Sequence, residues 1–241
     1  EHTPVWTLTD KFYGQPYILC YLGNFGGNVR LAGNFHQASE RIDDAIANGG
    51  DNMCGIGSTL EGFGINQFMY EFVLDKAWSS GISDEDWVRT LASRRTGRVD
   101  PHAENVWKTL TDSIYIAGSF SSQTPLTCAR PCLEGYWSWT SIHNTRYDNA
   151  TLIRAWKELL EVPSDRDTYY SDVVNLGTQA LGNHFAVLRD QFTAAYRASD
   201  LEAARSVADQ MLQLLDDLDA LAACDPQLSL KRWLDDASAW G

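Results

Sequence analysis

Only two segments of this chain have the character of buried β-strands, and a helix-sized stretch separates them. The first is an apolar run at residues 16–22, and the second is a shorter run at residues 53–58. Residues 36–48 have the length of a helix, and apolar side chains recur at helical spacing again over residues 66–78. Strands and helices that alternate in this way are typical of parallel βα units. We therefore expect two parallel strands, the first of them buried on both faces.

Parallel βα units are the repeating elements of the (β/α)8-type barrel, which needs eight strands to close. Two strands cannot close such a barrel, so we expect most of it to lie upstream of Glu1. Residues 1–82 would then be the C-terminal part of the barrel. Catalytic groups in these barrels follow the C-terminal ends of the strands, and Glu61 has this place after the second strand.

The remainder, residues 83–241, has the pattern of an all-α domain. Ser83 with Asp86 is typical of a helix cap, and Asp100 precedes a proline at the first position of a helix. The predicted helices are residues 84–95, 101–117, 148–161, 167–196, 200–223 and 227–239. The fold class is therefore α/β followed by all-α.

Charge and residue spacing argue against several kinds of partner. The 19 Lys and Arg residues against 32 Asp and Glu residues give a net charge of −13, which would repel a nucleic-acid backbone. No run of about 18 apolar residues occurs, so no membrane span is expected. The five histidines lack the spacing of a zinc-protease helix, and Cys128 with Cys132 makes at most half of a zinc site. We expect no metal, although these two cysteines are close enough in sequence to pair.

Glu61 is the acid whose surroundings best fit catalysis. Glycosidases use two carboxyl groups that flank the scissile bond. Gly55, Gly57, Gly62 and Gly64 around Glu61 leave open space, as a cleft requires. The alternative is that Glu61 is an acid at a helix N-terminus, stabilised by the helix dipole.

Three other features have both a functional and a structural interpretation. Arg94 and Arg95 could hold anions, but arginines at a helix end more often pair with nearby acids, and we favour that role. Trp137 and Trp139 could form a sugar-stacking platform, but we prefer a role in attaching the helical domain to its neighbour. Asn149 begins a glycosylation sequon, which has meaning only in a secreted protein.

Several blocks of the sequence resemble one known family. Residues 12–17 (Phe-Tyr-Gly-Gln-Pro-Tyr), 24–28 (Asn-Phe-Gly-Gly-Asn) and 55–62 (Gly-Ile-Gly-Ser-Thr-Leu-Glu-Gly) are similar to blocks of glycoside hydrolase family 89, the α-N-acetylglucosaminidases. Residues 94–97 and Trp107 match the helical domain of that family in order and spacing. The resemblance covers nearly the whole chain. It implies a (β/α)8-type catalytic barrel followed by an α-helical C-terminal domain.

The resemblance also implies an activity and a set of site residues. Members remove terminal α-linked N-acetylglucosamine (α-GlcNAc) from glycans such as heparan sulfate or mucin-type chains, with retention of configuration and without a cofactor. Glu61 would be the nucleophile, and Cys20, Leu22 and Asn24 would line the sugar pocket. Gly23 differs from the histidine of the lysosomal members, so the chain leans toward the bacterial branch. The family is secreted, periplasmic or lysosomal.

The resemblance places other parts of the site outside this chain. The acid/base glutamate of the family lies on an earlier strand, so the rest of the barrel from the same parent chain is the expected partner. The isolated chain is expected to show weak or absent turnover, and any strong activity would make Glu71 or Asp75 the next candidates for the acid. The alternative function is a helical carbohydrate-binding or assembly module without catalysis of its own.

Overall fold

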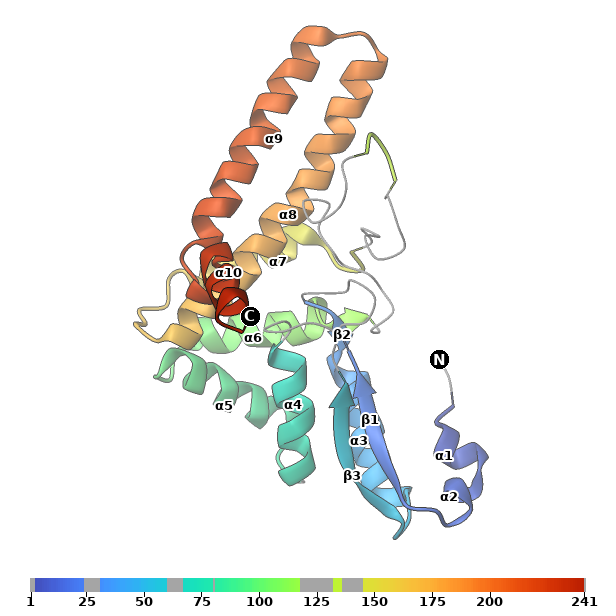
Figure 1. The fold of residues 1–241 in the computed structure, drawn as a ribbon. Helices are drawn as coiled ribbons and strands as arrows, with labels where there is room; N and C mark the ends of the chain where they lie inside the picture. The colour runs from blue at the N-terminus through green and yellow to red at the C-terminus, as the bar shows by residue number, and fades with distance from the viewer. Residues whose placement is uncertain are drawn as a thin grey trace.

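The computed structural model describes residues 3–23, 31–59, 67–79, 81–117, 132–135 and 145–240. A small two-stranded sheet with its helices forms one side of the molecule, and longer helices form the rest (Figure 1). The predicted site residues Asn24 and Glu61, together with Cys128, Trp137 and Trp139, lie outside the described residues.

The predicted order of strand, helix, strand and helix is confirmed. Strands β1 (Tyr17–Leu22) and β3 (Met53–Thr59) pair in parallel, and helix α3 (Phe35–Asn48) connects them. Helix α4 (Gln67–Trp78) follows β3. The side chain of Asn34 caps α3 by accepting a hydrogen bond from the backbone N–H of Gln37 at 3.0 Å.

The expectation that β1 is buried on both faces is wrong. Leu19 and Tyr21 pack against the core together with Ile56 of β3. Ile18 and Cys20 point the other way, and Ile18 is 61% exposed. The reason is the alternation of side chains along a strand: α3 and α4 cover only the face that bears Leu19 and Tyr21. The apolar run therefore has one open face in this structure.

The second part of the chain is helical, as predicted. Its elements are α5 (Asp84–Thr96), α6 (Pro101–Ser113), α7 (Asn149–Leu159), α8 (Asp167–Arg197), α9 (Leu201–Ala222), the 3-10 turn η3 (Pro226–Leu228) and α10 (Leu230–Ala239). Helices α8 and α9 run side by side as a long hairpin (Figure 1). The cap at Ser83 is confirmed, because its hydroxyl accepts from the backbone N–H of Asp86 at 3.1 Å.

The predicted helix over residues 101–117 is wrong at its end. The helix stops at Ser113, and strand β4 (Ile116–Ala117) follows. This strand pairs antiparallel with β2 (Gly33–Asn34), and the backbone N–H of Phe35 donates to the carbonyl of Tyr115 at 2.9 Å. Ile114 and Tyr115 are fully buried, and β-branched and aromatic residues favour an extended chain. The short pairing joins the helical part to the start of α3.

Two short turns near the start of the chain were not predicted. Helix α1 (Val5–Leu8) precedes α2 (Asp10–Tyr13). The residues of α2 have positive φ angles between 42° and 56°, so the turn is left-handed without containing glycine until Gly14 ends it. L-residues rarely adopt this conformation, and the sequence carries no local signal for it.

The core is continuous across the two parts of the chain. Phe72 of α4 lies at its centre, with ring centroids 4.3 Å from Phe35 of α3 and 5.0 Å from Trp87 of α5. Lys76, one turn further along α4, is buried and forms ion pairs with Asp43 at 3.0 Å and Asp84 at 2.9 Å. Apolar packing and a buried ion pair therefore both connect the βα units to the first helix of the helical part.

Candidate active site

The open face of the sheet brings together two of the predicted site residues. In the register of the two strands, Cys20 lies beside Gly57, and Leu22 lies beside Thr59. The sulfur of Cys20 is 3.2 Å from the hydroxyl of Thr59. A Cβ atom built at Gly55 would meet nothing within 4 Å, so this face of the sheet is open at that position of β3. Cys20 and Leu22 thus lie at the C-terminal end of β1 on a face with room for a ligand or for further side chains.

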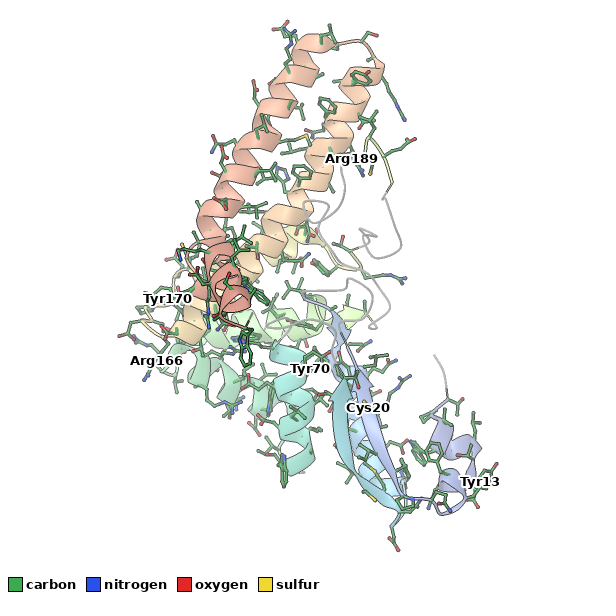
Figure 2. The ribbon with its side chains drawn as sticks, viewed as in Figure 1. Tyr13, Cys20, Tyr70, Arg166, Tyr170 and Arg189 are labelled. Carbon is green, nitrogen blue, oxygen red and sulfur yellow. The ribbon has the colours of Figure 1, made fainter. Side chains whose placement is uncertain are left out.

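Tyr70 of α4 closes the other side of the strand ends. Its hydroxyl donates to the carbonyl of Thr59 at 3.0 Å, and the backbone N–H of Gly23 donates to the same carbonyl at 3.4 Å. Burial raises the pKa of Tyr70 to about 12, so the phenol stays protonated and remains a donor. Figure 2 labels Tyr70 and Cys20 on the neighbouring elements α4 and β1. Sequence reasoning assigned no role to Thr59, which lies within the glycine-rich block, or to Tyr70, which follows it.

Gly23 fits closely between two tyrosines. A Cβ atom at this position would lie 2.7 Å from the hydroxyl oxygen of Tyr70 and 2.8 Å from a ring carbon of Tyr21. Such distances are shorter than van der Waals contact, so a side chain would displace one of the rings. The two rings meet edge to face with centroids 5.7 Å apart. The glycine is therefore required by the tyrosines that hold the end of β1.

Arg94 and Arg95 have the structural role favoured from the sequence. Arg94 contacts Glu71 at 2.9 Å and Asp75 at 3.1 Å, and Asp75 also accepts from the indole N–H of Trp87 at 3.0 Å. Glu71 and Asp75 are the two acids named as alternative proton donors. Both are engaged by arginines of α5, on the side of α4 that faces the helical part.

Arg95 is buried and contacts three side chains. Its side chain is 7% exposed, and its guanidinium lies 3.3 Å from Glu71, 3.4 Å from Gln67 and 3.4 Å from Asp172 of α8. Asp172 is a buried acid that sequence reasoning missed. The available signal was its place on the apolar stripe of the helix, three residues after Tyr169 and four before Leu176.

The carboxyl of Asp172 stays protonated up to a higher pH than an ordinary aspartate does. Burial raises its pKa to about 7, an effect that the charge of Arg95 opposes and the charge of Glu71 reinforces. The raised pKa means that the folded protein binds this proton more tightly than the unfolded chain does. The stabilisation from the protonated carboxyl is therefore lost as pH rises from about 4 to about 7.

Replacing Asp172 with asparagine should remove this pH dependence. We expect the melting temperature of Asp172→Asn minus that of the wild type to increase as pH rises from 4 to 8. The wild type loses stability when the buried carboxyl ionises, whereas Asn has no charge to bury. Thermal denaturation at several pH values measures the difference. Asp190→Asn is the control, since Asp190 is exposed and, within the part of the chain that the structure describes, forms an ion pair only with its neighbour Arg189. A pH-independent difference for Asp172→Asn would contradict the prediction.

Two other predicted features have structural roles. The side-chain amide of Asn149 donates to the carbonyl of Ala180 at 3.1 Å, and its oxygen accepts from Asn183 at 2.9 Å, so these contacts hold the sequon asparagine. Cys132 is a free cysteine, and its sulfur lies 3.8 Å from the guanidinium of Arg189. Within the described residues no three His, Cys, Asp or Glu side chains gather as metal ligands would. None of the described helices has the length and apolar character needed to cross a membrane.

Comparison with known proteins identifies the family. The family model of the alpha-N-acetylglucosaminidase (NAGLU) C-terminal domain matches residues 87–241, which is more than half of the chain. The chain belongs to the alpha-N-acetylglucosaminidase family. The model of the NAGLU TIM-barrel domain matches residues 1–80. The predicted fold class is therefore confirmed as part of a TIM barrel followed by the helical C-terminal domain. The boundary between residues 82 and 83 stays a prediction.

Individual members of the family agree with this assignment. Human alpha-N-acetylglucosaminidase is 30% identical over 249 residues, covering 99% of this chain and 33% of the human protein. The family 89 glycoside hydrolase of Clostridium perfringens, in complex with 2-acetamido-1,2-dideoxynojirmycin, superposes with a TM-score of 0.77 at 24% identity, over 90% of this chain and 25% of that chain. CpGH89 of the same organism, in complex with its substrate GlcNAc-alpha-1,4-galactose, gives a TM-score of 0.78 at 24% identity, over the same shares.

The chain thus spans about a third of the human relative and a quarter of the bacterial ones. The superpositions establish the fold. The open face of the two-stranded sheet is consistent with that partial coverage, because side chains from all the strands fill the interior of a closed barrel.

Proposed function

We propose that this chain is part of a retaining exo-α-N-acetylglucosaminidase that hydrolyses terminal, non-reducing α-GlcNAc from glycans. The observation that carries the proposal is the match of the family's barrel and C-terminal domain models, in that order, to residues 1–80 and 87–241. The sheet supports it, since Cys20 and Leu22 lie together at the C-terminal end of β1. That end is where barrel enzymes place their catalytic groups.

Glu61 is the proposed nucleophile. It stands two residues after Thr59 in the sequence, and Thr59 shares the open face of the sheet with Leu22. Its carboxylate would attack C1 of the α-linked sugar and form a β-linked ester, while the C1–O bond to the leaving group breaks. Water then attacks C1, the ester bond breaks, and α-GlcNAc leaves with its original configuration. Glu61 regains its carboxylate, so no cofactor takes part in either step.

A second carboxyl group completes this chemistry. It protonates the leaving oxygen in the first step and accepts the proton of the attacking water in the second. Glu71 and Asp75 are poor candidates, because Arg94 and Arg95 pair with them on the side of α4 that faces the helical part. We propose that the remaining strands of the barrel come from the same polypeptide and carry this acid/base. Their side chains would also cover the open face at Ile18.

Cys20, Leu22 and Asn24 are proposed to line the pocket for the terminal sugar. Cys20 and Leu22 are two residues apart on one strand and therefore share a face, and Asn24 continues the same spacing in the sequence. The open space over Gly55 provides room on the same face. Apolar and small polar groups of this kind are typical of sugar-sized pockets.

The configuration of the first product tests the proposal. A chain of the full length of the family should hydrolyse an aryl α-N-acetylglucosaminide and release α-GlcNAc first, as seen by proton NMR before mutarotation. The aryl β-anomer should remain intact. The 241-residue chain alone should turn over at least about 10²-fold more slowly, because the proposed acid/base belongs to the remaining strands of the barrel. Release of the β-sugar first would contradict retention, and glycan binding without hydrolysis by the longer chain would favour the carbohydrate-binding alternative.

A further inference from the structure

The two residues that flank residues 60–66 are each held by a side chain, Thr59 by Tyr70 of α4 and Gln67 by Arg95 of α5. On the β3 side, the hydroxyl of Tyr70 donates to the carbonyl of Thr59 at 3.0 Å. On the helix side, the side-chain oxygen of Gln67 accepts from the guanidinium of Arg95 at 3.4 Å. Glu61 belongs to the sequence between these two points. The positions of Thr59 and Gln67 therefore set the span that this part of the chain has to bridge.

Arg95 reaches the start of α4 from the helical part of the chain. One guanidinium nitrogen contacts Glu71, and the other contacts both Gln67 and Asp172, at 3.3 to 3.4 Å. Gln67 and Glu71 are one turn apart on α4, whereas Asp172 approaches from α8. The planar guanidinium can serve three acceptors at once, which a lysine ammonium on its flexible stem does less well. Arg95 thus connects three helices at a single buried point.

A small cavity lies behind this contact. Its volume is about 30 Å³, and Gln67, Arg95, Trp107, Asp172 and Leu31 are among the residues that line it. Leu31 and Gln67, two of these lining residues, are the first described residues after positions 24–30 and 60–66 of the sequence. Within the described residues, the buried Nε of Arg95 and the indole nitrogen of Trp107 have no hydrogen-bond partner. A cavity of this size can hold one water, and these two nitrogens could donate hydrogen bonds to it.

We propose that Arg95 is a positioning residue for the reaction, which fixes the start of α4 through Gln67 and Glu71 and thereby the point at which the sequence that carries Glu61 joins α4. Asp172 holds the guanidinium from the opposite side. The inference rests on the proposed function of Glu61. It assigns the helical domain a part in catalysis without placing any of its described side chains against the substrate.

The neighbouring arginine shows why the role belongs to Arg95. Arg94 also pairs with Glu71, but its side chain is 48% exposed and its second partner is Asp75, one turn further from the start of α4. Within the described residues Arg94 forms hydrogen bonds and ion pairs with Glu71 and Asp75, and none with Gln67 or α8. The two arginines therefore share a helix, a charge and one partner, and they differ in the contact that matters for the proposal.

The first experiment changes the acceptor on α4 in a chain of full family length. Gln67→Met keeps the length of the side chain and removes the acceptor, and Gln67 is exposed, so the melting temperature should not change. We expect kcat on an aryl α-N-acetylglucosaminide to fall about tenfold or more with KM within twofold, because misplacement of a reacting group lowers the rate of the chemical step. Gln67→Glu, which keeps an acceptor for Arg95, should retain kcat near the wild type. Wild-type kcat in Gln67→Met would overturn the proposal.

The second experiment compares the two arginines. Arg95→Lys should lower kcat at least about tenfold more than Arg94→Lys, again with little change in KM. Equal effects of the two substitutions would overturn the proposal. Glu61→Ala, measured alongside, separates the two levels of inference. If Glu61→Ala stays active, the proposed function fails; if it is inactive while Gln67→Met and Arg95→Lys keep their kcat, only the role of Arg95 fails.

Discussion

Glu61→Ala should lower hydrolysis of an aryl α-N-acetylglucosaminide by about 10⁴-fold or more, the order seen when an enzyme loses its nucleophile. The reason is that the acids of α4 are not free to replace Glu61 as the nucleophile. Glu71 and Asp75 are the nearest acids along α4, and both are paired with arginines on the side away from the open face. The measurement is steady-state turnover of the full-length chain and its variant.

Azide should restore the activity of Glu61→Ala and reveal the geometry of attack. A small anion can enter the space left by the missing carboxylate and attack C1 from the same side. The product should then be the β-glycosyl azide, which NMR distinguishes from the α-anomer. Glu40→Ala is the matched control, since Glu40 is an exposed acid on α3 and should be neither inactivated nor affected by azide. Full activity of Glu61→Ala without azide would return Glu61 to the role of a structural acid.

The local parts of this fold could be predicted because each has a local cause. The alternation of apolar runs with a helix-length segment indicated β1, α3 and β3, and Ser83 indicated the start of α5. Fold class followed from that order alone. The family, the activity and the candidate roles of Cys20 and Leu22 came from the resemblance of whole blocks, because no single residue in them has a chemistry that identifies a glycosidase.

The features that escaped prediction depend on contacts between residues far apart in the chain. Strand β4 forms because residues 116–117 find a partner at Gly33 and Asn34, and helical periodicity near residue 113 does not contain that information. The contact between Arg95 and Asp172 likewise joins α5 to α8. A buried aspartate on an apolar stripe signals that some partner exists, but only the packing of the helices shows which one. The exposure of Ile18 follows from which face α3 and α4 cover, and the strand's own sequence does not determine it.

Phe72→Ala should lower the free energy of unfolding by about 3–5 kcal/mol, the usual cost of removing a large aromatic side chain from a core. Phe72 is 0% exposed and lies between Phe35 and Trp87, with the ammonium of Lys76 5.7 Å from its ring centre. Leu74→Ala on the same helix is the control, since Leu74 is 46% exposed and should cost less than about 1 kcal/mol. Equal losses would contradict the burial of Phe72.

Chemical denaturation followed by tryptophan fluorescence and by circular dichroism adds a further test, which asks whether the two parts of the chain unfold together. Because Phe72 joins α3 to α5, the βα units and the helical part should unfold together, and the substitution should shift one common transition. Two transitions, of which only one moves, would mean that the continuous core does not couple the two parts. The role of Arg95 as a positioning residue would then be supported only by its contacts with Gln67, Glu71 and Asp172.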